Sequence, residues 1–383
     1  MTRLAVLLLC SALASPALAQ ELRATGDLGV VVERATGSVL IVDQSEHAAI
    51  GRVEGLGDLS HASLVFSPDE RFAFVFGRDG GLTKVDILTQ KIVGRVVQSG
   101  NSIGGAISDD GKLVAVANYE PGGVNVFDAD TLEQVASIPA GGKALGLEDA
   151  AGRKFVFSVW DTNETKIVDF SGSNDPVITT LSDIGENPYD ALVTDDGRTY
   201  IAGLFGEDGL TAIDLWADTP EARRILPHYG RGAEEMPVYK MPHLEGWAKA
   251  GDQIVLPAIH HHEVLWVDAR TLEETGRTEV HSQPVFAMAR PGGRQVWVNF
   301  AHPDNDTVQV IDTMSHEIIG EMKPGPAVLH MEFTSRGTEA WVSVRDENKV
   351  VIYDTTTLEP IGEIAAESPS GIFFTARAHR LGL

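Results

Sequence analysis

One motif recurs eight times along the chain: an apolar run that ends in an aspartate, as in LIVD, VNVFD and VLWVD. The aspartates are Asp43, Asp86, Asp128, Asp169, Asp214, Asp268, Asp312 and Asp354, with spacings of 43, 42, 41, 45, 54, 44 and 42 residues. Each period also holds a turn and a second apolar run, such as SPDE followed by FAFVF. Short strands and turns at a period of this length indicate the four-stranded blades of a β-propeller.

Eight motifs predict eight blades, and therefore an all-β fold in which residues 20–383 form a single eight-bladed β-propeller domain. The C-terminal run GIFFTARA (371–378) has no turn or aspartate motif of its own. It can complete the blade that GVVVERATGSVLIVD (29–43) begins, so that strands from both termini close the ring. The long interval between Asp214 and Asp268 predicts an inserted loop near residues 228–240, over one face.

The first residues, MTRLAVLLLCSALASPALAQ, have the form of a secretory signal peptide. Arg3 provides the positive region, residues 4–13 the apolar region, and Ala17-Leu18-Ala19 an A-x-A cleavage site. We expect residues 1–19 to be removed and the soluble product to reside in the periplasm; the alternative is an N-terminal core helix. No later apolar run is long enough to span a bilayer, so we expect no membrane insertion.

Cleavage would remove Cys10, the only cysteine, and with it any disulfide or C-x-x-C-H haem attachment. It would also remove Arg3 and change the formal charge from −25 to −26. Such acidity argues against nucleic acid or an anionic membrane as a partner. The chain has no G-x-S-x-G or H-E-x-x-H motif and no G-x-G-x-x-G in a βαβ context, so hydrolase activity and a nucleotide cofactor have little support.

In a propeller, the loop that precedes each inner strand and the loop between the second and third strands open on the same face of the channel. His61 lies just before its inner strand. The corresponding positions of the other blades are Ser102, Lys143, Tyr189, His243, Gln283, His330 and Ser370. The loops between second and third strands add Arg78, Tyr119, Trp160, Phe205, His260 to His262, Phe300, His302 and Arg345.

This ring of histidines, arginines and aromatic residues suits a flat, apolar ligand that bears carboxylates. Aromatic side chains would form its walls, guanidinium groups would bind carboxylates, and an imidazole would bind a metal. The alternative is a polar, water-filled channel mouth. His260 to His262 could likewise form a metal site or only a solvated loop, and Asp149 could be a pocket carboxylate or only a turn residue.

The stretch SHASLVFSPDERFAFVFGRD resembles the segment of the cytochrome cd1 nitrite reductase propeller that carries the axial histidine of haem d1. NYEPGGVNVFDADTLE, YKMPHLEG, EFTSRGTEAWVSV and SPSGIFF resemble further segments of that propeller in the same order. The resemblance covers nearly all of the chain after residue 19, and it includes the blade count. It implies a haem d1 site on the channel.

By this resemblance, His61 matches the axial ligand of the haem iron, and Arg78 matches an arginine that binds a haem carboxylate. Tyr119 matches a tyrosine at the edge of the pocket. His330 falls where the reductase uses a glutamine, and Ser370 falls where it uses a threonine. The resemblance therefore implies a cofactor-binding set of these five residues, with His61 as the ligand of the metal.

Two departures from the reductase argue against nitrite reduction. His243 matches one of the two distal histidines, but Tyr189 replaces the other, and Leu244-Glu245-Gly246 stand where a basic residue is expected. The electron-donating cytochrome c domain is also absent, since no cysteine remains to anchor its haem. We expect a protein that is not a nitrite reductase.

A haem d1 propeller without a cytochrome domain resembles a family of periplasmic proteins that denitrifying bacteria need to make haem d1. A related dehydrogenase of that pathway keeps the cytochrome domain and fits less well. The resemblance implies haem d1 or its late tetrapyrrole precursor as the bound ligand. It also implies other proteins of the pathway and cytochrome cd1 nitrite reductase as partners.

The sequence is compatible with three functions. The first is an enzyme that oxidises tetrapyrrole side chains, with Tyr189, His243 and Asp149 as the groups that move protons. The second is a non-catalytic carrier that delivers haem d1 to nitrite reductase. The third is a sugar- or peptide-binding propeller that shares only its architecture with the reductase.

Overall fold

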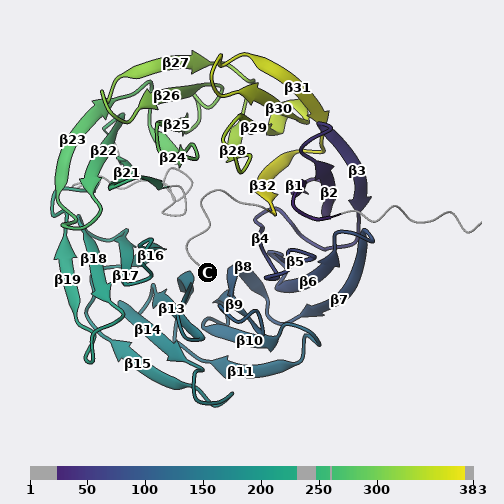
Figure 1. Cartoon of the computed structure of the whole chain (residues 1–383). Helices are drawn as coiled ribbons and strands as arrows, with labels where there is room; N and C mark the ends of the chain where they lie inside the picture. Colours follow the sequence, from purple (N-terminus) through teal and green to yellow (C-terminus); the bar gives the residue numbers. More distant parts are fainter. Residues whose placement is uncertain (1–23, 231–246, 259–260, 376–383) are drawn as a thin grey trace, which may run out of the picture.

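The computed structural model describes residues 24–230, 247–258 and 261–375. Within these residues, strands β1 to β32 form eight four-stranded antiparallel sheets, arranged as blades around a central channel (Figure 1). The predicted all-β, eight-bladed propeller is therefore confirmed. The one helix among the described residues is a short 3-10 turn, η3 (Arg345–Glu347).

The blades repeat one strand order from the channel outward. The inner strands are β4 (Ser63–Phe66), β8 (Asn101–Ile107), β12 (Ala144–Ala150), β16 (Pro188–Val193), β20 (Ala248–Ala250), β24 (Pro284–Ala289), β28 (Val328–Phe333) and β32 (Pro369–Phe374). The second strands are β5 (Phe72–Phe76), β9 (Leu113–Glu120), β13 (Lys154–Val159), β17 (Thr199–Leu204), β21 (Gln253–Pro257), β25 (Gln295–Phe300), β29 (Glu339–Val344) and β1 (Leu28–Glu33).

The third strands are β6 (Gly81–Asp86), β10 (Val124–Asp128), β14 (Glu164–Asp169), β18 (Leu210–Asp214), β22 (Glu263–Asp268), β26 (Val308–Asp312), β30 (Lys349–Asp354) and β2 (Ser38–Asp43). Each of them ends at one of the repeated aspartates. The outer strands are β7 (Lys91–Val97), β11 (Gln134–Ile138), β15 (Val177–Leu181), β19 (Ala222–Ile225), β23 (Glu274–Glu279), β27 (Ile318–Met322), β31 (Pro360–Ala365) and β3 (Ala48–Val53).

Strands from the two ends of the chain close the ring, as predicted. The first blade has the order β3-β2-β1-β32, and β32 lies beside β1 in Figure 1. The antiparallel pairing joins Gly29 to Phe374 and Val31 to Ile372. A side chain at position 29 would meet the Phe374 ring at 2.5 Å, so the closing phenylalanine fits because residue 29 is glycine. Residues 376–378 of the GIFFTARA run lie outside the described residues.

The repeated aspartates have a structural role that accounts for their recurrence. The Oδ1 atom of Asp312 accepts hydrogen bonds from the backbone N–H groups of Met314 and Ser315, both at 2.9 Å. Its Oδ2 atom accepts one from Arg294 Nε at 3.1 Å. Asp86, Asp128, Asp214, Asp268 and Asp354 accept from the N–H two residues ahead in the same way. The carboxylate thus satisfies backbone donors in a tight turn.

The connections alternate between the two faces of the ring because consecutive strands are antiparallel. The aspartate turns and the turns from inner to second strands lie on one face, which we call the lower face. The loops that precede the inner strands and the loops between second and third strands lie on the other, which we call the upper face. Any site built from the predicted ring of residues therefore belongs to the upper face.

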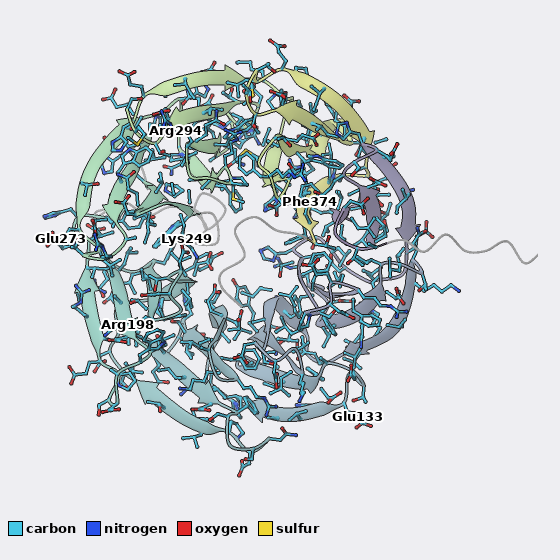
Figure 2. The ribbon with its side chains drawn as sticks, viewed as in Figure 1. Glu133, Arg198, Lys249, Glu273, Arg294 and Phe374 are labelled. Carbon is cyan, nitrogen blue, oxygen red and sulfur yellow. The ribbon has the colours of Figure 1, made fainter. Side chains whose placement is uncertain are left out.

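The core lies mainly between adjacent blades. Phe74 and Phe76 of one blade pack with Val114 and Val116 of the next, and all four side chains are fully buried. The inner strands carry the side chains that can reach the channel. In Figure 2, Glu133 and Glu273 lie at the outer rim, whereas Lys249 and Phe374 lie toward the channel.

Several predictions fall on parts of the chain that the structure does not describe. They are the signal peptide (1–19), most of the inserted loop near 228–240, and the side chains of His243 and His260. Among the helices of the described residues, none has the length and apolar character that crossing a membrane would need.

We expect Asp312→Ala to lower the free energy of unfolding by about 1–2 kcal/mol, because it removes the acceptor of two turn N–H groups and the partner of Arg294. Asp312→Asn is the matched control, since it keeps an acceptor oxygen but loses the charge, and its loss should be smaller. Urea unfolding at neutral pH measures the loss of unfolding free energy in each variant. Equal losses in the two variants would contradict the turn-forming role.

The stability difference between the wild type and Asp312→Asn should depend on pH. Backbone hydrogen bonds, first from Ser315, together with Arg294, lower the pKa of Asp312 from 3.8 to about 2. A carboxylate whose pKa is lower in the folded state stabilises that state above its unfolded pKa, and this contribution is lost as the pH falls. The stability difference between the wild type and Asp312→Asn should therefore shrink between about pH 4 and pH 2.

Candidate functional site

His61 lies on the upper face, in the short segment that leads into the inner strand β4. Its side chain is exposed, and its neighbours Ser60, Ala62 and Ser63 are small. The segment before it is fixed by backbone contacts: the N–H of Arg78 donates to the carbonyl oxygen of Asp58 at 2.8 Å. The predicted position of His61, at the upper end of an inner strand, is therefore the position that the structure shows.

Three arginines from three consecutive blades lie in equivalent loops of the upper face. Arg345 follows β29, Arg34 follows β1, and Arg78 lies between β5 and β6. The charges of Arg345 and Arg78 both act on Arg34, so the three guanidinium groups occupy one neighbourhood. We call Arg34, Arg78 and Arg345 the arginine cluster.

The arginine cluster is joined to the segment that carries His61. Arg34 Nη2 donates a hydrogen bond to the carbonyl oxygen of Ser60, the residue directly before His61. Asp58 Oδ1 accepts from the N–H of Ser60 at 2.8 Å. The hydrogen bonds from Ser60, followed by the charges of Arg78 and Arg34, hold the pKa of Asp58 below its usual value. Asp58 is thus an anion that helps to hold the cations together.

The cluster keeps a strong positive field in spite of this anion. Burial, and then the charge of Arg345, lower the pKa of the half-buried Arg34 guanidinium. Asp58 acts in the opposite direction on Arg34, and Asp346 pairs with Arg345 at 2.7 Å, so that two carboxylates lie beside three guanidinium groups. Arginine remains charged in such surroundings, and its planar fork matches a carboxylate. This corner of the upper face can therefore bind anionic groups.

A pair of tyrosines and two further aromatic rings form another part of the upper face. The hydroxyl groups of Tyr119 and Tyr189 are hydrogen-bonded to each other. Trp160 meets Tyr189 edge to face, with ring centroids 5.9 Å apart, and lies 5.2 Å from the ring of Phe205. Arg78 is close enough to Tyr119 for its charge to lower the pKa of that phenol, which connects this aromatic wall with the arginine cluster.

Asp190 is a carboxylate beside the two tyrosines. Burial raises the pKa of Tyr119 and of Tyr189, and the negative charge of Asp190 raises both further. Asp190 is half-buried on β16, where the pairing with β17 shifts register between Pro188 and Ala191. Such a bulge turns side chains out of the regular alternation of a strand. Two neutral phenols and one carboxylate thus lie together at this edge of the channel.

His330 and Ser370, the last two predicted cofactor-binding residues, lie near the upper ends of β28 and β32. These are the inner strands of neighbouring blades, and both side chains are half-buried. The Oγ atom of Ser370 is buried and makes no hydrogen bond within the described part of the chain. A polar group in this condition suits a ligand that brings its own partner.

The structure does not bring Asp149 to this face. Asp149 is exposed near the end of β12, next to the turn at 151–153 on the lower face, whereas Tyr189 is at the start of β16. Phe300 also differs from its prediction: it is the last residue of β25 and 1% exposed, so it belongs to the core. Asp149 lies five residues, or roughly 16 Å, along β12 from Ala144 at the upper end of that strand.

Other residues of the predicted ring have structural partners. Ser102 Oγ donates to the carbonyl oxygen of Gly77 at 2.6 Å, and Gln283 Nε2 donates to that of Ala258 at 2.9 Å. Lys143 and Asp161 form an exposed ion pair at 3.1 Å. His261 and His302 are exposed in their loops.

Arg34 and Asp190 are the two site residues that the sequence analysis missed. Arg34 occupies the loop of the closing blade that corresponds to those of Arg78 and Arg345, so counting all eight loops between second and third strands would have found it. Asp190 directly follows a predicted residue, but strict alternation places it on the opposite side of the strand from Tyr189. The bulge in β16 overrides that alternation.

The site has an exposed imidazole, that of His61, beside the arginine cluster. Within the described residues, no group of three or more His, Cys, Asp or Glu side chains could hold a metal ion. A haem iron needs only an axial ligand from the protein, because the macrocycle provides the other donors. The imidazole of His61 is a side chain of the type that can serve as such a ligand.

Comparisons with known proteins show the family to which this chain is similar. A model of the family described as Cytochrome D1 heme domain matches residues 23–378. Protein NirF of Stutzerimonas stutzeri is 59% identical over 372 residues, which cover 95% of both chains. Protein NirF of Pseudomonas aeruginosa is 56% identical over 384 residues, 98% of both. The dihydro-heme d1 dehydrogenase of P. aeruginosa is 27% identical over 360 residues, 90% of this chain and 70% of that one.

Solved structures support the fold. The dihydro-heme d1 dehydrogenase NirN in complex with DHE superposes with a TM-score of 0.81 at 24% identity, covering 93% of this chain and 77% of the other. Apo AztD from Citrobacter koseri gives a TM-score of 0.66 at 13% identity, over 90% and 96% of the two chains. The family match over most of the sequence, with identities of 56% and 59% to NirF proteins, shows that the chain belongs to the cytochrome D1 heme domain family.

Proposed function

We propose that this protein binds haem d1 or its late tetrapyrrole precursor at the upper mouth of the channel and oxidises a side chain of that precursor during haem d1 synthesis. The observation that carries the proposal is the placement of His61 beside the arginine cluster, with the Tyr119–Tyr189 pair and Asp190 along the same face. Family membership and the name of the related dihydro-heme d1 dehydrogenase support the choice of ligand.

Each part of the ligand has a matching group in this site. The imidazole of His61 would hold the iron, and its small neighbours leave room for a planar ligand. The arginine cluster would bind carboxylates that the low polarity of the mouth would otherwise disfavour. Trp160 would contact the flat face or edge of the macrocycle, and Ser370 would bond a polar substituent.

The proposed reaction removes two electrons and two protons from a saturated side chain and leaves a carbon–carbon double bond. When bound, the iron macrocycle supplies a conjugated system that stabilises charge next to the reacting side chain. Asp190 would take one proton, and the Tyr119–Tyr189 pair would relay it toward solvent; the second proton would also pass to solvent, or to the acceptor where a quinone is reduced to a quinol. The electrons would pass to an external redox protein or quinone, since the chain has no nucleotide-binding motif.

The alternative is a carrier that holds haem d1 and delivers it to nitrite reductase. Its support is that His61, the arginine cluster and the aromatic wall are sufficient for binding alone. The two functions differ in what happens to the precursor, and this difference is measurable.

We further propose that the protein acts in the periplasm, after removal of residues 1–19, with proteins of the haem d1 pathway and cytochrome cd1 nitrite reductase as partners. The support is the form of the N-terminal sequence for the location, and membership of the cytochrome D1 heme domain family for the partners. His243 and Asp149 complete the catalytic candidates from the sequence. The first lies outside the described residues, and the second lies near the lower face.

The first prediction separates enzyme from carrier. Incubation of the protein with the late precursor and a quinone or cytochrome acceptor should give a product lighter by two hydrogen atoms, as read by mass spectrometry. Tyr189→Phe keeps the ring that packs on Trp160 but removes the hydroxyl, so it should bind the precursor and slow the conversion. A precursor that binds with unchanged mass under every acceptor condition would favour the carrier.

The second prediction concerns the arginine cluster. Arg78→Ala should weaken haem d1 binding by roughly 1.5–3 kcal/mol, the usual contribution of a charge-assisted hydrogen bond. Arg198→Ala is the matched control, because Arg198 pairs with Asp214 at 2.6 Å on the lower face. Titration with haem d1 measures the binding free energy of the wild type, Arg78→Ala and Arg198→Ala. A loss under about 1 kcal/mol for Arg78→Ala would indicate only a surface charge interaction.

The third prediction concerns the iron ligand. His61→Ala should fold like the wild type, because the side chain is exposed, but it should lose the spectral shift of added haem d1 and fail to support haem d1 production in cells. His302→Ala, which removes an exposed histidine from another upper-face loop, should behave like the wild type. If His61→Ala binds haem d1 with an unchanged visible spectrum, His61 is not the ligand.

A further inference from the structure

His61 lies near the end of a segment that crosses the upper face from one blade to the next. This crossing segment, residues 54–62, leads from the outer strand β3 of the closing blade to the inner strand β4 (Figure 1). Leu56 and Leu59 are 1% and 0% exposed and belong to the core between these two blades. The segment is therefore anchored in the core at two points, while the His61 side chain is exposed.

The main chain of the crossing segment is bonded to the hairpins of both blades. The N–H of Leu56 donates to the carbonyl oxygen of Gly37, between β1 and β2, at 3.1 Å. The carbonyl oxygen of Asp58 accepts from the N–H of Arg78, between β5 and β6, at 2.8 Å. The segment cannot shift against either hairpin without breaking one of these hydrogen bonds.

An ion pair holds the segment from the rim of its own blade. Arg95 of the outer strand β7 donates from Nη2 to Asp79 Oδ2 at 2.6 Å and from Nε to the carbonyl oxygen of Leu56 at 3.2 Å. Asp79 Oδ1 accepts from the N–H of Gly81 at 3.0 Å, which fixes the carboxylate to the hairpin between β5 and β6. We call Arg95 and Asp79 the arginine–aspartate clamp.

Gly57 shows how closely the clamp approaches the crossing segment. A Cβ atom at this position would overlap Asp79 Oδ2 and Arg95 Nη2. The residue also has a φ of 90°, a conformation that glycine adopts without strain. The backbone can therefore lie directly against the ion pair only because residue 57 is glycine, and this contact is four residues before His61.

The closing blade contains an equivalent pair. Arg52 of β3, like Arg95 of β7, directly follows a glycine in its outer strand. It donates from Nε and Nη2 to the fully buried carboxylate of Glu33 at 2.7 and 2.8 Å. Glu33 Oε1 also accepts from the N–H of Glu367, in the segment that leads into β32, at 2.9 Å. In both blades, an outer-strand arginine and an acid thus fix a segment that leads into an inner strand.

We infer that Arg95 and Asp79 are positioning residues for the axial ligand, because they fix the crossing segment so that the His61 imidazole meets the iron in one place. The inference deepens the proposed function and rests on it for the identity of the ligand. The partners that orient a metal-binding histidine commonly bond its ring. The clamp instead acts through the main chain, and a ligand that is already fixed has less freedom to lose on binding.

This role separates two contributions to ligand binding. The carboxylates of the macrocycle would bind the arginine cluster, whereas the bond to iron requires His61 in its place. Loss of the clamp should therefore weaken the binding of an iron tetrapyrrole more than the binding of the same tetrapyrrole without iron. A general disturbance of the site would weaken the binding of both ligands equally.

The first arm of the test needs no ligand. Hydrogen–deuterium exchange, read by mass spectrometry, compares the wild type with Arg95→Met and Arg277→Met. Arg277 is the matched control, because it also follows a glycine on an outer strand, β23, and pairs with Glu274 at 2.7 Å. We expect faster exchange in peptides from residues 54–62 for Arg95→Met alone. Unchanged exchange in these peptides would overturn the inference without any reference to haem d1.

A second variant covers the case in which Arg95→Met does not fold. Asp79→Asn removes the charge of the clamp but keeps an acceptor oxygen for the N–H of Gly81. It should accelerate exchange in the same peptides, and it can replace Arg95→Met in the binding measurements.

The second arm measures the affinity and the visible spectrum with haem d1 and with its metal-free form. We expect Arg95→Met to bind haem d1 roughly tenfold or more weakly and to alter its spectrum, as is common when the support of a metal ligand is removed. Affinity for the metal-free form should stay within about threefold of the wild type, the effect of a changed surface charge. Arg95→Lys, which keeps a cation beside Asp79, should lose less haem d1 affinity than Arg95→Met.

A double variant tests whether the clamp acts through His61. In a His61→Ala protein no imidazole is left to position, so adding Arg95→Met should change haem d1 affinity by less than about twofold. A further loss in that background as large as the loss in the wild-type background would show that the clamp acts on another part of the site, and would overturn the inference.

The outcomes distinguish this inference from the proposed function. A wild-type protein that does not bind haem d1, or binds it no more tightly than the metal-free form, would contradict the proposed function and the positioning role together. A wild type that prefers the iron form, with the same preference kept in Arg95→Met, would overturn the positioning role alone.

Discussion

The site depends on one structural event, the pairing of β32 with β1. This pairing joins residues near the two ends of the chain, and it is the contact that makes the ring continuous. It places the last complete blade, the closing blade and the blade that begins with β4 side by side. Arg345, Arg34 and Arg78 come from these three blades, so their proximity is a consequence of closure. The same closing strand also bonds His330, because the N–H of Ile372 donates to its Nδ1 atom.

The two faces of the ring use charge in opposite ways. On the lower face, aspartates accept hydrogen bonds from turn N–H groups, and several also pair with a nearby arginine, as Asp86, Asp214 and Asp312 do. Those charges stabilise the blades. On the upper face, the three guanidinium groups of the arginine cluster have two nearby carboxylates, Asp58 and Asp346. This imbalance is what a binding site for an anionic ligand requires.

The overall charge adds a constraint on how such a ligand is recognised. A formal charge of −25 disfavours the approach of an anion at long range. In physiological salt, this repulsion is screened beyond about 8–10 Å. The arginine cluster therefore acts at contact distance, where it provides direct hydrogen bonds as well as charge. Affinity would come from the geometry of the pocket more than from attraction by the whole surface.

The architecture could be predicted from the sequence because its signals are local and repeated. Each aspartate closes its own turn, so that eight motifs predict eight blades. The run at 371–378, which has no aspartate motif, had only one incomplete blade to join. The position of His61 followed from its distance to a turn. The resemblance to the nitrite reductase propeller, and not the repeat, selected His61, Arg78 and Tyr119 among the ring residues.

The errors arose where the structure breaks the repeat. Bulges in β16 and β28 change which side chains reach the channel, and the pattern of apolar residues does not reveal them. Asp190 was missed for this reason. Asp149 lies near the lower face because the turn beside it joins an inner strand to a second strand, as in the turn alternative that the sequence left open. Arg34 was missed because its blade is split between the two ends of the chain.

The central claim is that the ligand binds at the upper mouth, with its iron on His61. A crystal structure of the wild-type protein with haem d1 tests this most directly. The account predicts iron bonded to the His61 imidazole, carboxylates on the arginine cluster, and the edge of the macrocycle against the Tyr119–Tyr189 pair. A macrocycle bound at the lower face, or one whose iron is bonded to another residue while His61 faces solvent, would contradict it.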